Sequence, residues 1–152
     1  MSRLEDKLGE MGFALPKAWP YPSPNRTAVV QVGPILYVSG HGPGMPNLPG
    51  VRQKGKVGVD VTIEEGQATA RAVMLMILAS LKDYTGNLDR VKRVVRLFGM
   101  VNGGSDFRDF PKVIDGASGF VYDLWSSAST PARPSVPAAC RTTSSLRSTG
   151  SS

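Results

Sequence analysis

The composition of the chain changes abruptly after Trp125. From Ser126 to Ser152, twenty of twenty-seven residues are Ser, Thr, Pro or Ala, and the apolar periodicity of the preceding sequence stops. A segment of this composition buries too few side chains to offset an ordering cost of about 1–2 kcal/mol per residue. We therefore predict one folded domain over residues 1–125, followed by a disordered or loosely attached tail over residues 126–152.

Composition excludes several classes of protein. With 152 residues, of which 41% are hydrophobic, the chain has material for one core. No apolar run approaches the ~18 residues that would cross a bilayer, and the polar N-terminus is unlike a secretory signal, so we expect a cytoplasmic protein without a membrane partner. Cys140 and His41 are single residues of their kinds, which argues against an internal disulfide and a structural metal.

Local signals predict three helices. Two Ser/Thr-x-x-Glu capping boxes, which start at Ser2 and Thr62, mark the first turns of two helices. The first helix should end near Gly12, and the second, whose apolar residues recur at helical spacing, should end at Gly86. A third apolar face follows Asp109 and continues to residue 124.

Strand signals lie between these helices. Residues 28–32 and 35–39 are rich in β-formers and are separated by Gly33-Pro34, which predicts a hairpin. Residues 40–50 contain four Gly and three Pro and should form a loop, whereas residues 93–102 read as a further strand. We therefore predict an α+β domain in which two helices cover one face of a sheet. Without a last strand, that sheet is incomplete.

Several segments, in order, resemble the Rid family of enamine and imine deaminases, also called the YjgF family. The resemblance covers roughly residues 27–125 and is carried by five stretches: Leu36-Tyr-Val-Ser-Gly-His-Gly-Pro, Gly55-Lys-Val-Gly-Val-Asp-Val-Thr, Gln67-Ala, Asn87-Leu-Asp-Arg-Val, and Asp106-Phe ahead of Val113-Ile-Asp-Gly-Ala-Ser. It implies a chorismate-mutase-like α+β fold and a homotrimer with clefts between subunits. It also implies hydrolysis of 2-aminoacrylate-like enamines or imines to a 2-keto acid and ammonia, with no cofactor.

The resemblance also suggests site residues. Arg133 falls at the position of the family arginine that holds the substrate carboxylate, and its alternative is a solvated arginine in the tail. Ser39 and Gly40 match the family's end-of-strand motif and are expected to bind substrate. Arg26 stands where many members have tyrosine, and Asp115 stands where many have asparagine. Both are candidate substrate-binding residues, and each has a plain surface role as its alternative.

The tail carries a separate hypothesis. Family members end in a strand that bears an acidic residue, and this chain has no counterpart. Codons can be chosen for residues 125–152 that give a family-like ending when they are read in a shifted frame. The tail is therefore interpreted as disordered or as a frameshift product, and sequencing of the encoding DNA decides between the two.

Two further functions remain open. Arg26, Asp115 and the absent acidic strand favour a non-catalytic trimeric binder or a decayed family member. The net charge of +6 and the basic run at residues 90–96 would suit RNA binding or cleavage. However, half of the excess charge lies in the tail, and alternating Arg and Val describe a half-buried strand. No aromatic platform for base stacking is expected beside this run, so the sequence argues against a nucleic-acid partner.

Overall fold

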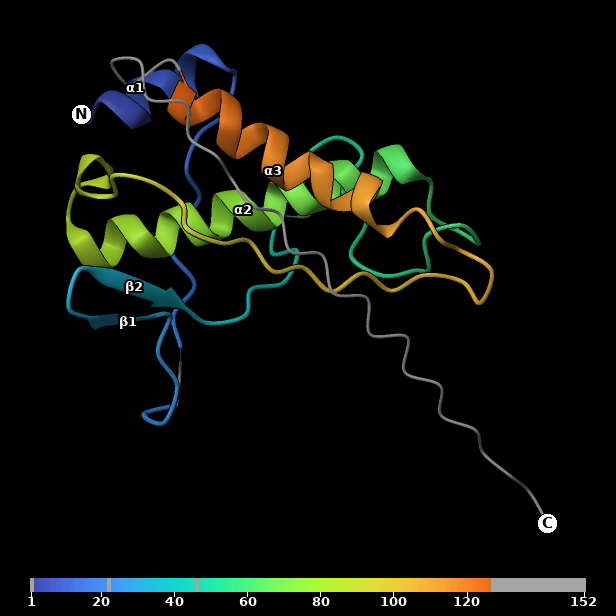
Figure 1. Ribbon diagram of the computed structural model, residues 1–152, viewed down its shortest axis with the longest axis horizontal. Coiled ribbons are helices and arrows are strands. Elements are labelled where there is room, and N and C mark those ends of the chain that lie inside the picture. The colour runs from blue at the N-terminus through green and yellow to red at the C-terminus, as the bar shows by residue number, and fades with distance from the viewer. Residues whose placement is uncertain (1, 22, 46, 127–152) are drawn as a thin grey trace.

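The computed structural model describes residues 2–21, 23–45 and 47–126. The predicted tail, including Arg133 and Cys140, lies outside the described residues except for Ser126. Along the described chain the elements follow in the order α1 (Arg3–Glu10), β1 (Val29–Val32), β2 (Ile35–Val38), α2 (Ile63–Thr85), the 3-10 turn η1 (Leu88–Arg90) and α3 (Phe110–Ser126). Helices α2 and α3 cross one another, and the hairpin lies on the other side of α2 (Figure 1).

The termini of α2 confirm the predicted helix. The hydroxyl of Thr62 accepts a hydrogen bond from the Glu65 amide, and the Glu65 carboxylate accepts one from the Thr62 amide, which completes the capping box. At the other end, Gly86 adopts a φ of 74°, and its amide donates to the Lys82 carbonyl. A left-handed residue at this position is favourable only for glycine, so local sequence determines both ends of the helix.

The predicted hairpin is also present. Val29–Val32 pairs with Ile35–Val38 in antiparallel register, and Gly33 has the positive φ, 58°, that a tight two-residue turn requires. One face of the hairpin, with Val29 buried and Val38 half-buried, packs on the core. The opposite face presents four apolar side chains that are 41–61% exposed, namely Val30, Val32, Ile35 and Tyr37.

The core lies where α2 packs on α3. Gly66 on α2 and Gly116 on α3 permit close approach: a Cβ at Gly116 would lie 2.6 Å from the Cα of Gln67. Helix α1 packs on the same core through Leu4 and Leu8, both 1% exposed. Two main-chain hydrogen bonds to the Asp89 carboxylate, from Arg3 and Leu4, hold the first turn of α1 in place.

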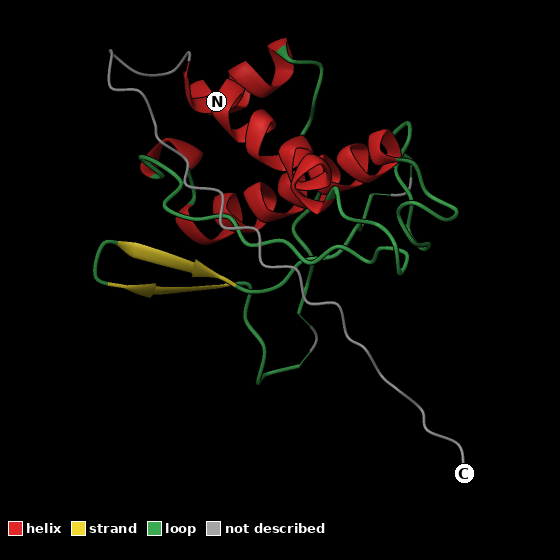
Figure 2. Cartoon of the chain, turned by 45° about the vertical axis from the view of Figure 1, so that its right-hand side comes forward, coloured by secondary structure: helices red, strands yellow, loops and turns green. Residues whose placement is uncertain are grey.

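The predicted strand at residues 93–102 is wrong for the described structure, in which this segment forms neither a helix nor a named strand. A strand needs a hydrogen-bonded neighbour as well as β-forming residues. Among the described residues, β1 and β2 form the one sheet, and they pair with each other. The segment instead passes as a loop beside α2 (Figures 1 and 2).

The α+β prediction holds with a smaller sheet than expected. Both long helices lie on the same side of the hairpin (Figure 2), but α2 lies directly against it. Two strands are about 10 Å wide, which is the diameter of one helix, so the hairpin has room for α2 alone. None of the helices in the described part of the chain is long and apolar enough to cross a membrane.

Candidate functional site

Ser39 continues the pairing of the hairpin beyond β2. Its amide donates to the Ala28 carbonyl at 2.9 Å, and its hydroxyl donates to the Thr27 carbonyl at 2.5 Å. The hydroxyl is therefore engaged with main chain, while the following residue, Gly40, is exposed. The Ser39 hydroxyl oxygen can still accept a hydrogen bond from a ligand, and the exposed backbone of Gly40 is open to one as well.

His41 connects the end of the hairpin to α2. Its Nδ1 lies 2.8 Å from the Ser39 carbonyl oxygen, and its Nε2 lies 2.8 Å from the Ser80 hydroxyl. A carbonyl can only accept, so Nδ1 carries the proton, and in neutral His41 the Nε2 atom accepts from Ser80. Both ring nitrogens are occupied, which gives His41 a structural role in joining the end of the hairpin to α2. Ser80, 2% exposed, was not singled out from the sequence, although it is a polar residue within an apolar run.

The other three predicted site residues lie in different parts of the chain. Arg26 is exposed in the loop before β1 and lies beside Thr27, which Ser39 contacts. Asp115 is exposed on α3, where it accepts a 3.5 Å hydrogen bond from Ser118. Arg133 lies outside the described residues. Arg26, Ser39 and Gly40 thus lie together at the open end of the hairpin, and their role in binding substrate stays a prediction.

Asp115 is distant from this group within one chain. Its neighbour Gly116 packs on Gln67, whereas the Ser39 region is joined to α2 at Ser80. Gln67 and Ser80 are thirteen residues apart on the same helix, which corresponds to about 20 Å at 1.5 Å per residue. A site that uses both Asp115 and Ser39 would therefore need two chains.

The loop over residues 40–52 is attached along α2. Beyond the His41 bond, the Arg52 amide donates to the Thr69 hydroxyl and the Arg52 side chain forms a 2.8 Å ion pair with Glu65. The hydrogen bond from the Thr62 amide, followed by the Arg52 contact, holds the pKa of Glu65 below its ordinary value. The carboxylate therefore stays charged and keeps the end of the loop against the helix.

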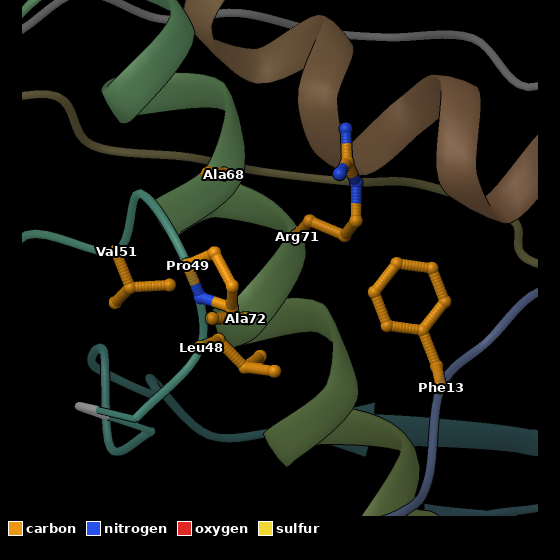
Figure 3. A pocket seen from close by; sticks show the side chains of 7 residues that line it. All are labelled: Phe13, Leu48, Pro49, Val51, Ala68, Arg71 and Ala72. Atoms are coloured by element: carbon orange, nitrogen blue, oxygen red, sulfur yellow. The ribbon is translucent and has the colours of Figure 1, made fainter.

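Between this loop and α2 lies a cavity of about 210 Å³. It is lined by six apolar residues and a single charged one, Arg71; the apolar residues are Phe13, Leu48, Pro49, Val51, Ala68 and Ala72. Figure 3 shows Leu48, Pro49 and Val51 on one side of α2 and the Phe13 ring on the other, with the Arg71 side chain extending from α2 on the same side as Phe13. The guanidinium lies over the Phe13 ring, 5.9 Å from its centroid.

Sequence reasoning missed Arg71. The available signal is that Arg71 is the one charged residue between Gln67 and Lys82, in the most apolar part of the chain. Among the described residues there is no group of three or more His, Cys, Asp or Glu side chains that could hold a metal ion. The one charged group among the residues that line the cavity is therefore the Arg71 guanidinium, and the other lining residues are apolar.

Comparison with protein families gives one extended match. Residues 5–144 match the family model described as "YjgF/chorismate_mutase-like, putative endoribonuclease". The matched range is longer than the stretch that carried the sequence resemblance. It contains all five predicted site residues, Arg133 included.

Individual proteins agree with the family match. Protein TCP17 of Trypanosoma cruzi is 37% identical over 123 residues, which cover 81% of this chain and 75% of that protein. A crystal structure of a "putative endoribonuclease" from Shewanella oneidensis superposes with a TM-score of 0.78 at 28% identity, covering 92% of this chain and 87% of the other. The Agrobacterium tumefaciens protein Atu1372, of unknown function, gives a TM-score of 0.74 at 30% identity, covering 95% and 83%.

Proposed function

Because the chain belongs to the YjgF/chorismate-mutase-like family, we propose that it hydrolyses 2-aminoacrylate-like enamines, or their imine tautomers, to a 2-keto acid and ammonia. The observation that carries the proposal is the family match, because it extends over Arg26, Ser39, Gly40, Asp115 and Arg133 together. The exposed backbone of Gly40 beside a fixed Ser39 adds a polar surface of the kind such a substrate needs.

The reaction asks for few parts. Arg133 would hold the substrate carboxylate through a planar pair of hydrogen bonds. Water would add to the imine carbon, the carbon–nitrogen bond would break, and ammonia would leave as the carbonyl forms. Gly40 would orient the substrate, and Asp115 and Arg26 would line the same cleft. As a carboxylate, Asp115 accepts hydrogen bonds and cannot donate one, so its role in the cleft would be to accept from the imine nitrogen or the water.

The proposal includes a homotrimer with sites between subunits. Two observations support it: the outer face of the hairpin is apolar and exposed, and Asp115 is about 20 Å along α2 from the Ser39 group. An exposed apolar sheet face is normally covered by a partner. Light scattering should give about three times the chain mass of 16.2 kDa.

A coupled assay tests the chemistry. A dehydratase generates 2-aminoacrylate from serine, and the release of pyruvate is followed with and without the protein. Arg133→Ala should abolish the acceleration, whereas Arg141→Ala, which removes the same charge from the same segment, should retain it. No acceleration by the unmodified trimer would favour the alternative, a non-catalytic binder or decayed member of the family.

RNA cleavage is a second candidate because the family description and the Shewanella oneidensis relative carry that label. One contact favours it: Arg96 lies over the exposed ring of Phe98, 5.8 Å from its centroid, which places one aromatic side chain beside the basic run. The contacts of His41 argue against RNA cleavage, because both ring nitrogens are hydrogen-bonded and neither is available as a general base. Nucleic-acid binding would weaken steeply with salt, unlike enamine hydrolysis.

A further inference from the structure

We propose that the cavity between α2 and the 40–52 loop is a binding site for a small aliphatic monocarboxylate, with Arg71 as its anion-binding residue. The site is formed within one chain. It is separate from the proposed reaction at the end of the hairpin and does not depend on that reaction being correct.

The charge of Arg71 indicates an anionic ligand. Its side chain is half-buried, yet none of the four ion pairs among the described residues involves it. Within the described part of the chain, its guanidinium lies over the Phe13 ring and has no carboxylate or carbonyl partner. A guanidinium has five N–H donors, and removing them from water without an acceptor costs free energy. A bound carboxylate would supply the missing acceptors through two parallel hydrogen bonds.

Arg71 differs from the other described cations of the chain in its burial and in its lack of an acceptor. Arg52, Lys82 and Lys112 each have a carboxylate within 2.9 Å, and Arg108 donates to two main-chain carbonyls. Arg96 also lies over a phenylalanine ring, but it is exposed to water. Arg71 thus combines partial burial with the lack of an acceptor among the described residues.

The volume and the lining of the cavity define the class of ligand. A volume of about 210 Å³ equals that of roughly seven water molecules at about 30 Å³ each, so it holds a molecule of a few carbons. Leu48, Pro49 and Val51 offer apolar surface for a short hydrocarbon tail (Figure 3). The lining contains no second cation that could pair with the second carboxylate of a dicarboxylate ligand. A nucleotide would exceed the volume of the cavity.

The ligand would therefore bind with its carboxylate at Arg71 and its tail against the loop residues. Burial of apolar surface favours binding in proportion to the area covered, so a branched tail of four or five carbons should bind more tightly than acetate. The same class includes 2-keto acids with aliphatic side chains. The 40–52 loop is held to α2 at His41 and at Arg52, so the cavity wall is formed before the ligand arrives.

Calorimetric titration of the full chain with 3-methylbutanoate tests this site. We expect binding by the unmodified protein and at least a tenfold higher Kd for Arg71→Gln, with Arg71→Lys between the two because it keeps the charge but loses the planar pair. Arg96→Gln is the matched control, since it also removes an arginine from a phenylalanine ring, and it should bind like the unmodified protein. Unchanged thermal unfolding of each variant shows that it is folded.

The neutral analogue 3-methylbutanamide makes the test independent of any variant. It has the same shape without the charge and should bind at least tenfold more weakly than the acid. Equal affinity for acid and amide, no binding of the acid to the unmodified protein, or unchanged affinity in Arg71→Gln would each overturn the proposal. Loss of pyruvate release in Arg133→Ala with 3-methylbutanoate binding intact would show that the two sites are separate.

Discussion

Gly116 is where one added methyl group should most strongly disturb the packing of α2 on α3. A Cβ built there lies 2.6 Å from the Cα and 2.7 Å from the carbonyl carbon of Gln67. Both atoms are main chain and cannot rotate away, so the helices must separate. Overpacking of this kind costs about 1–3 kcal/mol, and a more rigid clash costs more. The gain in helix propensity from Gly to Ala returns about 1 kcal/mol.

Gly119, three residues along the same helix, is the matched control. A Cβ there meets nothing within 4 Å, so Gly119→Ala should gain up to about 1 kcal/mol from helix propensity and from the reduced entropy of the unfolded chain. Set against its own gain of about 1 kcal/mol in helix propensity, Gly116→Ala should lower the free energy of unfolding by up to about 2 kcal/mol. The two variants should therefore differ by the cost of overpacking, about 1–3 kcal/mol, with Gly119→Ala the more stable.

Thermal unfolding followed by circular dichroism measures the difference. For a chain of this size, 1 kcal/mol shifts the Tm by about 2–4 °C, so the two variants should be separated by roughly 2–12 °C. Protein concentration must be equal in all samples, because association changes the apparent stability. A Gly116→Ala variant as stable as Gly119→Ala would refute the close approach of the two helices.

Four smaller predictions follow from named contacts. Thr62→Ala removes the hydroxyl half of the capping box and should cost about 0.5–2 kcal/mol of stability in urea denaturation. Asp89→Ala leaves the first amides of α1 without their acceptor, so hydrogen exchange should accelerate in α1 and stay unchanged in the middle of α2. The pKa of Glu65 in the folded chain lies below its ordinary value of 4.5, so the unfolded chain binds a proton first as the pH falls. The stabilising effect of the Glu65 carboxylate is therefore present above pH 4.5 and is lost as the pH falls through the folded pKa. Glu65→Gln should flatten this part of the profile of stability against pH. Val32→Lys places a charge on the exposed apolar face of the hairpin and should reduce the proposed trimer to monomer in light scattering. A variant that is still trimeric would exclude the hairpin from the proposed interface.

Local sequence accounts for the elements that were predicted correctly. The Thr62 capping box and Gly86 act within a few residues of themselves, and the Gly33-Pro34 turn determines which residues of the hairpin face each other. Such signals do not depend on the rest of the fold. The family fold could likewise be predicted, because its motifs keep their order along the chain.

Signals that depend on distant partners were the ones that failed or were missed. Residues 93–102 have strand propensity, but propensity does not supply a neighbouring strand, and the described structure pairs them with neither β1 nor β2. The cavity at Arg71 is assembled from Phe13, the 48–51 loop and α2, and no single one of these segments indicates it. The predictions for the tail and for Arg133 fall outside the described residues and stay predictions.

The most direct test of the proposed hydrolysis compares two substrates with one preparation of the protein. Pyruvate release from dehydratase-generated 2-aminoacrylate and cleavage of a single-stranded RNA are measured at low and high salt. The account predicts faster pyruvate release at both salt concentrations and no RNA cleavage. Salt-sensitive RNA cleavage without any acceleration of pyruvate release would contradict it.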